Sequence, residues 1–290
     1  MPQQDTGKFR TNGADKFYTK EAVAATCFEK ICSTCPGLNS WLWIEPSAGS
    51  GVFLRAVPSG WRHVGIDIEP AGAGVVEGDF LSWVAPADAG KKVVFGNPPF
   101  GRQGSLAKKF IARACGAVGA DIVAFILPRS FVKPSMSRAF PLRFHCLLSE
   151  ELGSDSFEVN GASYDVPCVF QIWERREEDR QVEIGEEPEG FEYVGAGAGA
   201  GAAAHIAFRR VGVNAGRCFL MGDGVFSPQS HYFLRVSKKY VEAGLLDLFV
   251  ATVNEIEFPS NTVGPRSLSK GEVNAVLNKV LASFNEMLEE

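Results

Sequence analysis

The chain contains a series of short apolar segments that each end in a turn, and this series constrains the fold most. The segments are Trp41–Ile44, His63–Ile68, Lys92–Gly96, Asp121–Leu127 and Val166–Trp173. Strands that are buried on both faces of a sheet have this length and this near-continuous apolar composition. Apolar residues recur at helical spacing over residues 20–35 and 105–118. The alternation predicts an α/β fold with a doubly wound, mostly parallel sheet.

The pattern changes after Trp173. Residues 174–192 are rich in acidic side chains, and residues 195–204 read GAGAGAGAAA, which offers almost no side-chain surface to pack. We therefore predict a main domain over residues 1–176, a linker over 177–204 and a small α+β module over 205–290. The module has strand-like segments and two helical ones, near 238–251 and 270–288. It either stands alone or packs back onto the main sheet.

Local signals add detail to this division. Ser269 and Glu272 have the spacing of a capping box at the start of the last helix. A helix is also expected after the glycine-rich turn that ends at Gly51, because that turn follows a strand.

Composition and charge limit the classes of protein. Of the 290 residues, 46% are hydrophobic and 22% are charged, which is typical of a globular chain. We find no apolar run long enough to span a bilayer and no apolar core of a signal peptide, so we expect a soluble intracellular protein of the cytoplasm or nucleus, with no membrane partner. The net charge is −5, whereas proteins that bind long nucleic acids through phosphates are usually basic. Any contact with nucleic acid is therefore expected to be local, or assisted by a protein partner.

The seven cysteines are expected to be reduced and buried, because their number is odd and several lie in apolar segments. Cys32 and Cys35 form a CxxC pair, but no second ligand pair lies at a spacing typical of zinc sites. We therefore expect no metal.

The turn at Glu45–Gly51 follows the first strand and has the sequence EPSAGSG. Glycines in such a turn allow backbone N–H groups to approach a ligand closely. Asp67 stands at the end of the next strand, where an acid commonly accepts hydrogen bonds from ribose hydroxyls in doubly wound folds. Together the turn and Asp67 predict a nucleotide-like ligand. An ordinary strand–helix turn with a surface aspartate is the alternative.

The tetrapeptide Asn97-Pro98-Pro99-Phe100 ends another strand, and it is the most informative motif. Two prolines fix the backbone and cannot continue a ladder, so the Asn97 side-chain oxygen and the Pro98 carbonyl can point at one site. Two acceptors can bind both hydrogens of an amino group, and Phe100 offers a flat face to a planar substrate. The motif therefore predicts methyl transfer to an amino nitrogen by positioning and electrostatics. A proline-rich turn is the alternative.

The order of these features resembles that of the class I amino-methyltransferases, and in particular the N(6)-adenine methyltransferases with the gamma order of motifs. The resemblance covers residues 15–173, rather more than half of the chain. It implies a Rossmann-like methyltransferase fold for the main domain and S-adenosyl-L-methionine as the cofactor. The segment Lys16–Thr19 is similar to the part of that family that helps to hold the methionine moiety, and Asp79-Phe80 is similar to its acid-aromatic pair beside the cofactor adenine.

The resemblance also implies roles for individual residues. The implied cofactor-binding residues are Phe17, Tyr18, Thr19, Glu45, Pro46, Ser47, Ala48, Gly49, Gly51, Asp67, Ile68, Asp79, Phe80 and Asn97. The implied catalytic residues are Asn97, Pro98, Pro99 and Phe100.

Substrate contacts are less well defined by the sequence. The family has a second aromatic residue that stacks on the target base before a late strand, and Phe157 or Tyr164 has a similar position, with Phe157 preferred. Arg129 and Lys133 lie in the loop after the strand that follows the tetrapeptide, where a phosphate would run, although a solvated basic loop is equally consistent. Arg209-Arg210 in the tail is a further candidate for a phosphate contact.

The sequence leaves several functions open. Methylation of adenine in DNA or RNA is favoured, which would make a nucleic acid the substrate and would need a duplex base to be flipped out. An RNA guanine amino-methyltransferase, a protein glutamine N-methyltransferase and a non-enzymatic pseudo-methyltransferase scaffold are the alternatives. The glycine turn, Asp67 and Asn97 argue against the scaffold, which need not keep contacts to a cofactor.

Overall fold

The computed structural model describes residues 10–11, 14–15, 18–159, 162–182, 185–195, 204–258 and 266–289. The chain divides into two compact units, Met1–Val182 and Glu183–Glu290, and each is described by itself. Two strands of two residues each, β1 (Arg10–Thr11) and β2 (Ala14–Asp15), pair antiparallel before the main sheet begins.

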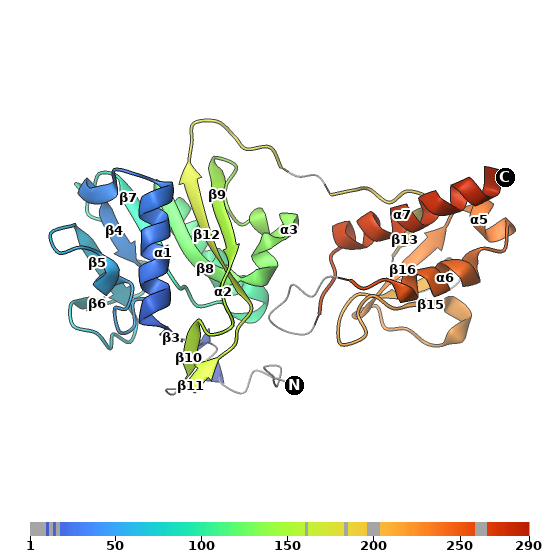
Figure 1. Ribbon diagram of the computed structural model, residues 1–290, viewed down its shortest axis with the longest axis horizontal. Helices are drawn as coiled ribbons and strands as arrows, with labels where there is room; N and C mark the ends of the chain where they lie inside the picture. The colour runs from blue at the N-terminus through green and yellow to red at the C-terminus, as the bar shows by residue number, and fades with distance from the viewer. Residues whose placement is uncertain are drawn as a thin grey trace. The chain divides into compact units, whose positions relative to one another are not determined.

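A seven-stranded sheet forms the centre of the first unit (Figure 1). Its strand order is β6-β5-β4-β7-β8-β12-β9. The strands are β4 (Leu42–Glu45), β5 (His63–Asp67), β6 (Val75–Glu77), β7 (Lys92–Gly96), β8 (Ile122–Pro128), β9 (Phe144–Glu151) and β12 (Cys168–Arg175). Neighbouring strands from β6 to β8 are parallel, whereas β12 is antiparallel to both β8 and β9. The sheet is doubly wound and mostly parallel, so the predicted α/β fold class is confirmed.

Side chains alternate between two apolar layers, as the period of a strand requires. In β4, Leu42 and Ile44 belong to the core layer that includes α2 (Ser105–Cys115). Trp43, between them, contacts Phe28 of α1 (Glu21–Thr34), with ring centroids 5.0 Å apart. Figure 1 shows α1 lying across the front of the sheet. Helices therefore cover both faces, which explains the nearly continuous apolar strands.

The helix expected after the glycine-rich turn is reduced to one 3₁₀ turn, η2 (Leu54–Ala56). The physical reason is Pro58. The residue before a proline avoids the helical region, and Val57 is extended at φ −75°, ψ 127°. Other short turns are η1 (Leu38–Ser40), η3 (Arg102–Gly104), η4 (Arg129–Val132) and α3 (Pro134–Ser137).

A small three-stranded sheet holds the segment before α1. Its order is β11 (Ala162–Tyr164), β10 (Phe157–Val159) and β3 (Tyr18–Thr19). Lys20 extends the pairing, since its amide donates to the Ser156 carbonyl at 3.1 Å and its ammonium pairs with Asp155. This sheet fixes the position of Thr19, whose side chain reaches the tetrapeptide.

The second unit is an antiparallel sheet with helices on one face. The strand order is β13 (Phe191–Val194), β16 (His231–Val236), β14 (Ile206–Arg209) and β15 (Cys218–Leu220). The helices are α5 (Lys238–Glu242), α6 (Leu246–Glu255) and α7 (Lys270–Glu289), with the 3₁₀ turn η5 (Met221–Asp223) after β15. The predicted capping box is present, since the Ser269 amide donates to Glu272 Oε2 at 2.9 Å and the Glu272 amide donates to Ser269 Oγ at 3.4 Å.

The predicted linker over residues 177–204 needs a correction. Within it, Phe191–Val194 form β13, which pairs with β16, and Phe191 joins the core of the second unit. The sequence analysis missed this strand because acidic residues surround it and its partner strand, β16, is distant in the sequence. The alanine-glycine run at 196–203 lies outside the described residues.

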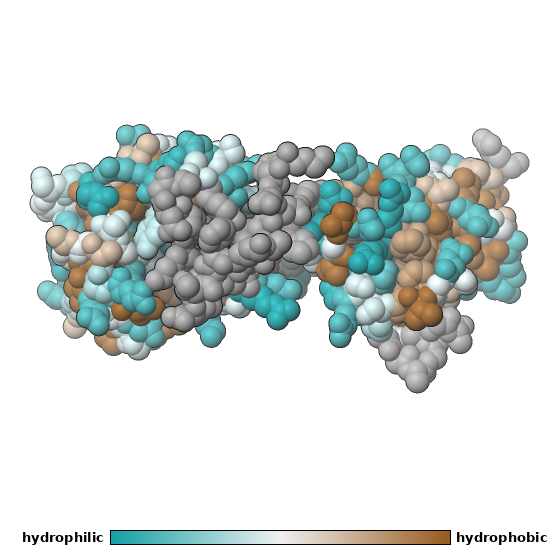
Figure 2. Space-filling model, turned by 90° about the horizontal axis from the view of Figure 1, so that it is seen from below, coloured by the Kyte–Doolittle hydropathy of each residue, from teal (hydrophilic) through white to brown (hydrophobic). Residues whose placement is uncertain are grey.

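Where residues are coloured in Figure 2, hydrophobic ones lie in patches among hydrophilic ones. The most exposed large apolar side chains in the described ranges are Val84, Val213 and Val225. None of the helices that the structure describes combines the length and the apolar character needed to cross a bilayer.

Arg180 explains why the first unit continues past residue 176. Its guanidinium donates to the carbonyls of Pro141, Phe144, Ser137 and Phe140 at 2.5 to 3.0 Å. Its plane also lies 5.2 Å from the ring of Trp173 in β12. One side chain therefore joins the end of the acidic segment to the loop before β9.

We predict that Arg180→Ala lowers the free energy of unfolding by at least about 1.5–3 kcal/mol, the worth of one hydrogen bond from a charged donor. Arg180→Lys should recover only part of it, because an ammonium lacks the planar fork of donors. Thermal and urea unfolding measure the effect. Arg176→Ala is the matched control, since Arg176 is exposed and pairs with Glu174. Equal losses for the two alanine variants would contradict the structural role of Arg180.

Candidate functional site

A cavity of about 570 Å³ lies at the carboxyl edge of the main sheet. The ends of β4, β5 and β7 meet there, as parallel strands require, and this edge is where ligands bind in open α/β sheets. Many of the residues singled out from the sequence line it. They are Tyr18, Thr19, Glu45, Pro46, Ser47, Ala48, Gly49, Asp67, Ile68, Asp79, Phe80, Asn97, Pro98, Pro99 and Phe100.

The glycine-rich turn is held by Asp67. The Gly49 amide donates to Asp67 Oδ2 at 2.7 Å, and the Glu69 amide donates to Oδ1 at 2.8 Å. Gly49 has φ +49°, a left-handed conformation that favours glycine. Gly51 does not line the cavity but closes the turn, since its amide donates to the Ala48 carbonyl at 2.6 Å. Each carboxylate oxygen of Asp67 keeps a second lone pair for a ligand.

Aromatic side chains form an apolar part of the cavity wall. Phe80 is buried and stacks on Phe110 of α2, with centroids 5.4 Å apart and planes 26° apart. Ile68 also lines the cavity and is 64% exposed, an unusual state for this side chain. Phe110 was missed by the sequence analysis, because its position in an amphipathic helix is equally typical of a core residue.

The tetrapeptide is fixed from two sides. Asn97 Nδ2 donates to Thr19 Oγ1 at 3.1 Å, and Ser47 Oγ donates to the Asn97 carbonyl at 3.0 Å. The first bond sets which way the Asn97 amide faces, so its oxygen is turned away from Thr19. The Phe100 carbonyl accepts from the amides of Leu106 and Ala107 and thereby begins α2. The bond between Thr19 and Asn97 joins residues 78 positions apart, which no local pattern could reveal.

Glu45 is a buried carboxyl group in the cavity wall, with 1% of its surface exposed. The Leu54 amide donates to its Oε2 at 3.2 Å. Burial raises the pKa of Glu45 well above its usual range, the Leu54 amide opposes the rise, and the charge of Asp67 adds to it. Burial therefore favours the neutral form of Glu45, while Asp67 beside it accepts two amide bonds.

This burial predicts a pH-dependent stability difference between the parent and Glu45→Gln. The unfolded chain releases the Glu45 proton near the ordinary pKa of 4.5, whereas the folded chain keeps it to higher pH. The contribution of Glu45 to stability is therefore complete below pH 4.5 and is lost as pH rises through the folded pKa. Relative to the parent, Glu45→Gln should become more stable as pH rises above 4.5 and through the folded pKa of Glu45. Melting temperatures across this range provide the test, and a constant difference would mean that Glu45 is ionised in the fold.

The other predicted residues whose side chains the structure describes do not line the cavity. Arg129 forms a two-pronged ion pair with Glu151 of β9, with Nε at 2.8 Å from Oε1. Lys133 is buried at 7% exposure. Phe157 is fully buried in β10, where it faces Thr19 and Tyr164 across the small sheet. The side chain of Tyr164 and all of Phe17 lie outside the described residues.

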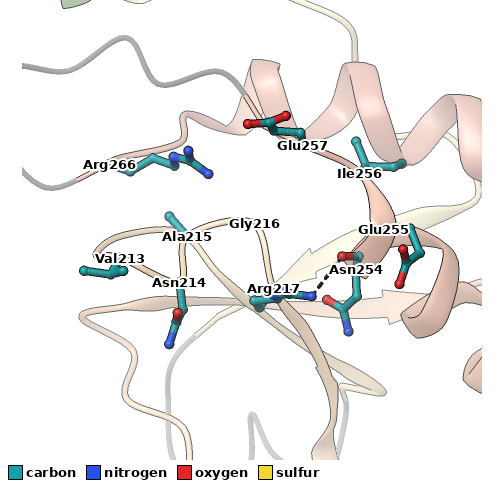
Figure 3. Close-up of a pocket in the computed structure, with 10 residues that line it drawn as sticks. All are labelled: Val213, Asn214, Ala215, Gly216, Arg217, Asn254, Glu255, Ile256, Glu257 and Arg266. Carbon is teal, nitrogen blue, oxygen red and sulfur yellow. Dashed lines mark hydrogen bonds between the residues drawn. The ribbon is translucent and has the colours of Figure 1, made fainter. Parts of the chain in front are cut away.

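A second hollow, of about 290 Å³, lies in the second unit (Figure 3). Arg217 donates to the Asn254 carbonyl at 2.9 Å, and the Asn254 side chain holds the backbone of Cys218 at both N and O. Figure 3 shows Arg266 and Glu257 reaching toward the same space from different segments. Charges of both signs line this hollow, and none of the sequence motifs falls in it.

Comparisons with known proteins give likenesses of structure only. No family model matches the sequence, and no curated protein matches it. Among solved structures, PH1948 of Pyrococcus horikoshii, a proposed RNA methyltransferase, is 14% identical with a TM-score of 0.44, over 60% of this chain and 93% of that chain. The 23S rRNA methyltransferase ErmE is 13% identical with a TM-score of 0.41, over 57% and 71%. A type I restriction-modification methyltransferase subunit from Streptococcus thermophilus is 14% identical with a TM-score of 0.42, over 58% and 46%. At such low sequence identity and TM-scores, these structures give no information about the substrate of this chain.

Proposed function

We propose that this protein is an S-adenosyl-L-methionine-dependent methyltransferase that acts on the exocyclic amino group of adenine in nucleic acid. The observation that carries the proposal is the position of Asn97, whose side-chain amide donates to Thr19 and whose backbone carbonyl accepts from Ser47 of the glycine-rich turn. A cofactor site and an amine-orienting motif thus share one cavity.

The residues present fit the cofactor. The cavity volume of about 570 Å³ is within the range of sites for molecules of this size. Asp67 offers lone pairs to ribose hydroxyls, the turn offers backbone N–H groups, and Phe80 with Ile68 offers apolar surface to an adenine ring. The carboxyl groups of Asp67 and Asp79 suit a ligand that carries positive charge. When bound, the cofactor supplies an activated methyl group on a sulfonium.

The acceptor chemistry follows from hydrogen-bond inventory. The Asn97 oxygen and the Pro98 carbonyl are acceptors, and a primary aromatic amine has two hydrogens to donate. Two such bonds hold the nitrogen and direct its lone pair out of the ring plane. The fixed backbone means that these acceptors need no reorganisation during the reaction, which is the main source of electrostatic catalysis. Phe100, at 4% exposure in the cavity wall, offers apolar contact to the acceptor.

The most direct test is a panel of methyl-transfer reactions with labelled S-adenosyl-L-methionine. The acceptors are single- and double-stranded DNA, structured RNA and a protein extract, each followed by analysis of the modified nucleoside or amino acid. N(6)-methyladenosine or its deoxy form supports the proposal. N(2)-methylguanine or N-methylglutamine as the sole product would overturn the adenine assignment, and no product with any acceptor would overturn the enzymatic one.

Asn97 should be essential for turnover. Asn97→Ala removes one preorganised acceptor, which typically lowers kcat about 10²–10³-fold. Asn97→Asp keeps an acceptor and should retain more activity. Single-turnover transfer at saturating cofactor measures both, on variants with the melting temperature of the parent. Thr19→Val removes the acceptor that orients the amide and should lower kcat, while Thr19→Ser restores it. Full activity of Asn97→Ala would exclude the tetrapeptide as the catalytic site.

Asp67 should contact the ribose of the cofactor. Asp67→Ala alone is ambiguous, because it also removes the acceptor for the Gly49 and Glu69 amides. A double cycle that combines the protein variant with a modified ligand separates the loss of the ribose contact from the loss of the turn's hydrogen bonds. For the parent, removing the ribose 2′-hydroxyl from S-adenosylhomocysteine should weaken binding by about 1.5–3 kcal/mol, whereas Asp67→Ala should be nearly insensitive to it. Calorimetry measures the four affinities, and equal losses in both proteins would remove Asp67 from the ribose site.

A further inference from the structure

The loop that directly follows the tetrapeptide has an unusual backbone. Gly101, Gln103 and Gly104 have φ values of +66°, +54° and +72°. Gln103 is the only non-glycine residue with positive φ in the described part of the chain. Such a conformation typically costs about 1–3 kcal/mol and persists where surrounding structure enforces it, often next to ligands.

Packing at the two glycines enforces this conformation. A Cβ at Gly101 would lie 2.8 Å from Leu106 Cβ, and one at Gly104 would lie 2.9 Å from Phe131 Cε2. The Gly104 amide also donates to the Gly101 carbonyl at 3.2 Å. Both glycines are therefore pressed against the body, while Arg102 and Gln103 between them are exposed. The loop holds these two side chains outward at a fixed place.

That place is beside the acceptor end of the cavity. Phe100 and Leu106 both line the cavity, and the loop joins them. Arg102 is two peptide units from Phe100, so their Cα atoms are at most about 7.6 Å apart. Among the described residues we find no hydrogen bond or ion pair that engages the Arg102 side chain, so its five donors are available to a ligand.

The two basic residues predicted from the sequence are placed differently. Arg129 is engaged by Glu151, and Lys133 is buried. Their use on a phosphate would require the exchange of an ion pair or the exposure of a buried chain. Arg102 requires neither. The carboxyl groups of the cavity wall lie at the ends of β4 and β5 and after β6. Arg102, in contrast, follows the tetrapeptide. The acidic and basic side chains therefore lie at different parts of the site.

We propose that Arg102 binds a backbone phosphate of the acceptor nucleic acid and so positions the target base at Asn97. This inference rests on the proposed function. It accounts for how an acidic chain, with a net charge of −5, can hold a polyanion through a local contact. A guanidinium suits this role, because its planar fork binds phosphate through paired hydrogen bonds.

The test measures binding of the full-length protein to a fluorescent single-stranded oligonucleotide, in the presence of S-adenosylhomocysteine, by anisotropy. Arg102→Ala should weaken binding about tenfold or more, the loss of one charge-assisted contact. The slope of log affinity against log salt concentration should also fall in magnitude by about 1, which corresponds to one phosphate contact. Arg102→Lys should recover part of the affinity. The affinity for S-adenosylhomocysteine, measured by calorimetry, should be unchanged.

Arg62→Ala is the matched control. Arg62 is an exposed arginine that directly precedes β5, so it lies at the opposite edge of the same sheet and its removal changes the net charge equally. Binding that falls equally in Arg62→Ala and Arg102→Ala would mean that net charge alone acts, and would overturn the inference. A parent protein that binds no oligonucleotide would overturn it as well.

The two proposals can fail separately. If nucleic acid is methylated but Arg102→Ala leaves Kd and KM at the parent values, the role of Arg102 is wrong and the function stands. If oligonucleotide binding depends on Arg102 while no methyl is transferred to nucleic acid, the role of Arg102 stands and the proposed reaction is wrong.

Discussion

The hydrogen bond from Ser47 Oγ to the Asn97 carbonyl joins the two turns on which the site depends. The turns follow β4 and β7, which are adjacent parallel strands, so their ends must lie at one edge of the sheet. The strand pairing sets this proximity, and the hydrogen bond sets the relative position of the two turns. Thr19 then fixes the orientation of the Asn97 amide from a third segment. Ser47 and Asn97 lie within two residues of the ends of β4 and β7, and Thr19 belongs to β3, so regular structure lies next to each anchor.

Local patterns in the sequence were sufficient for the fold and for the location of the cavity. Strand length, the glycine-rich turn, the acid after β5 and the proline-rich turn after β7 are all signals within a few residues. The sheet then brings them together through parallel pairing alone, which is why so many of the predicted residues line one cavity. The predicted doubly wound sheet is confirmed for the same reason.

Pairings between distant residues could not be predicted in this way. Arg129 is engaged by Glu151 because β8 and β9 flank β12, an order that no pattern in the loop reveals. Arg180 belongs to the first unit because four carbonyls from residues 137–144 surround it. β13 lies in acidic sequence, and its pairing partner β16 is distant along the chain. In each case the decisive partner lies more than twenty residues away.

The Glu45 carboxyl is buried in the cavity wall, which Asp67 also lines. Burial adds a desolvation penalty to its ionised form, the charge of Asp67 repels it, and both effects raise the pKa of Glu45. A positive charge placed nearby favours the ionised form and lowers the pKa of Glu45 again.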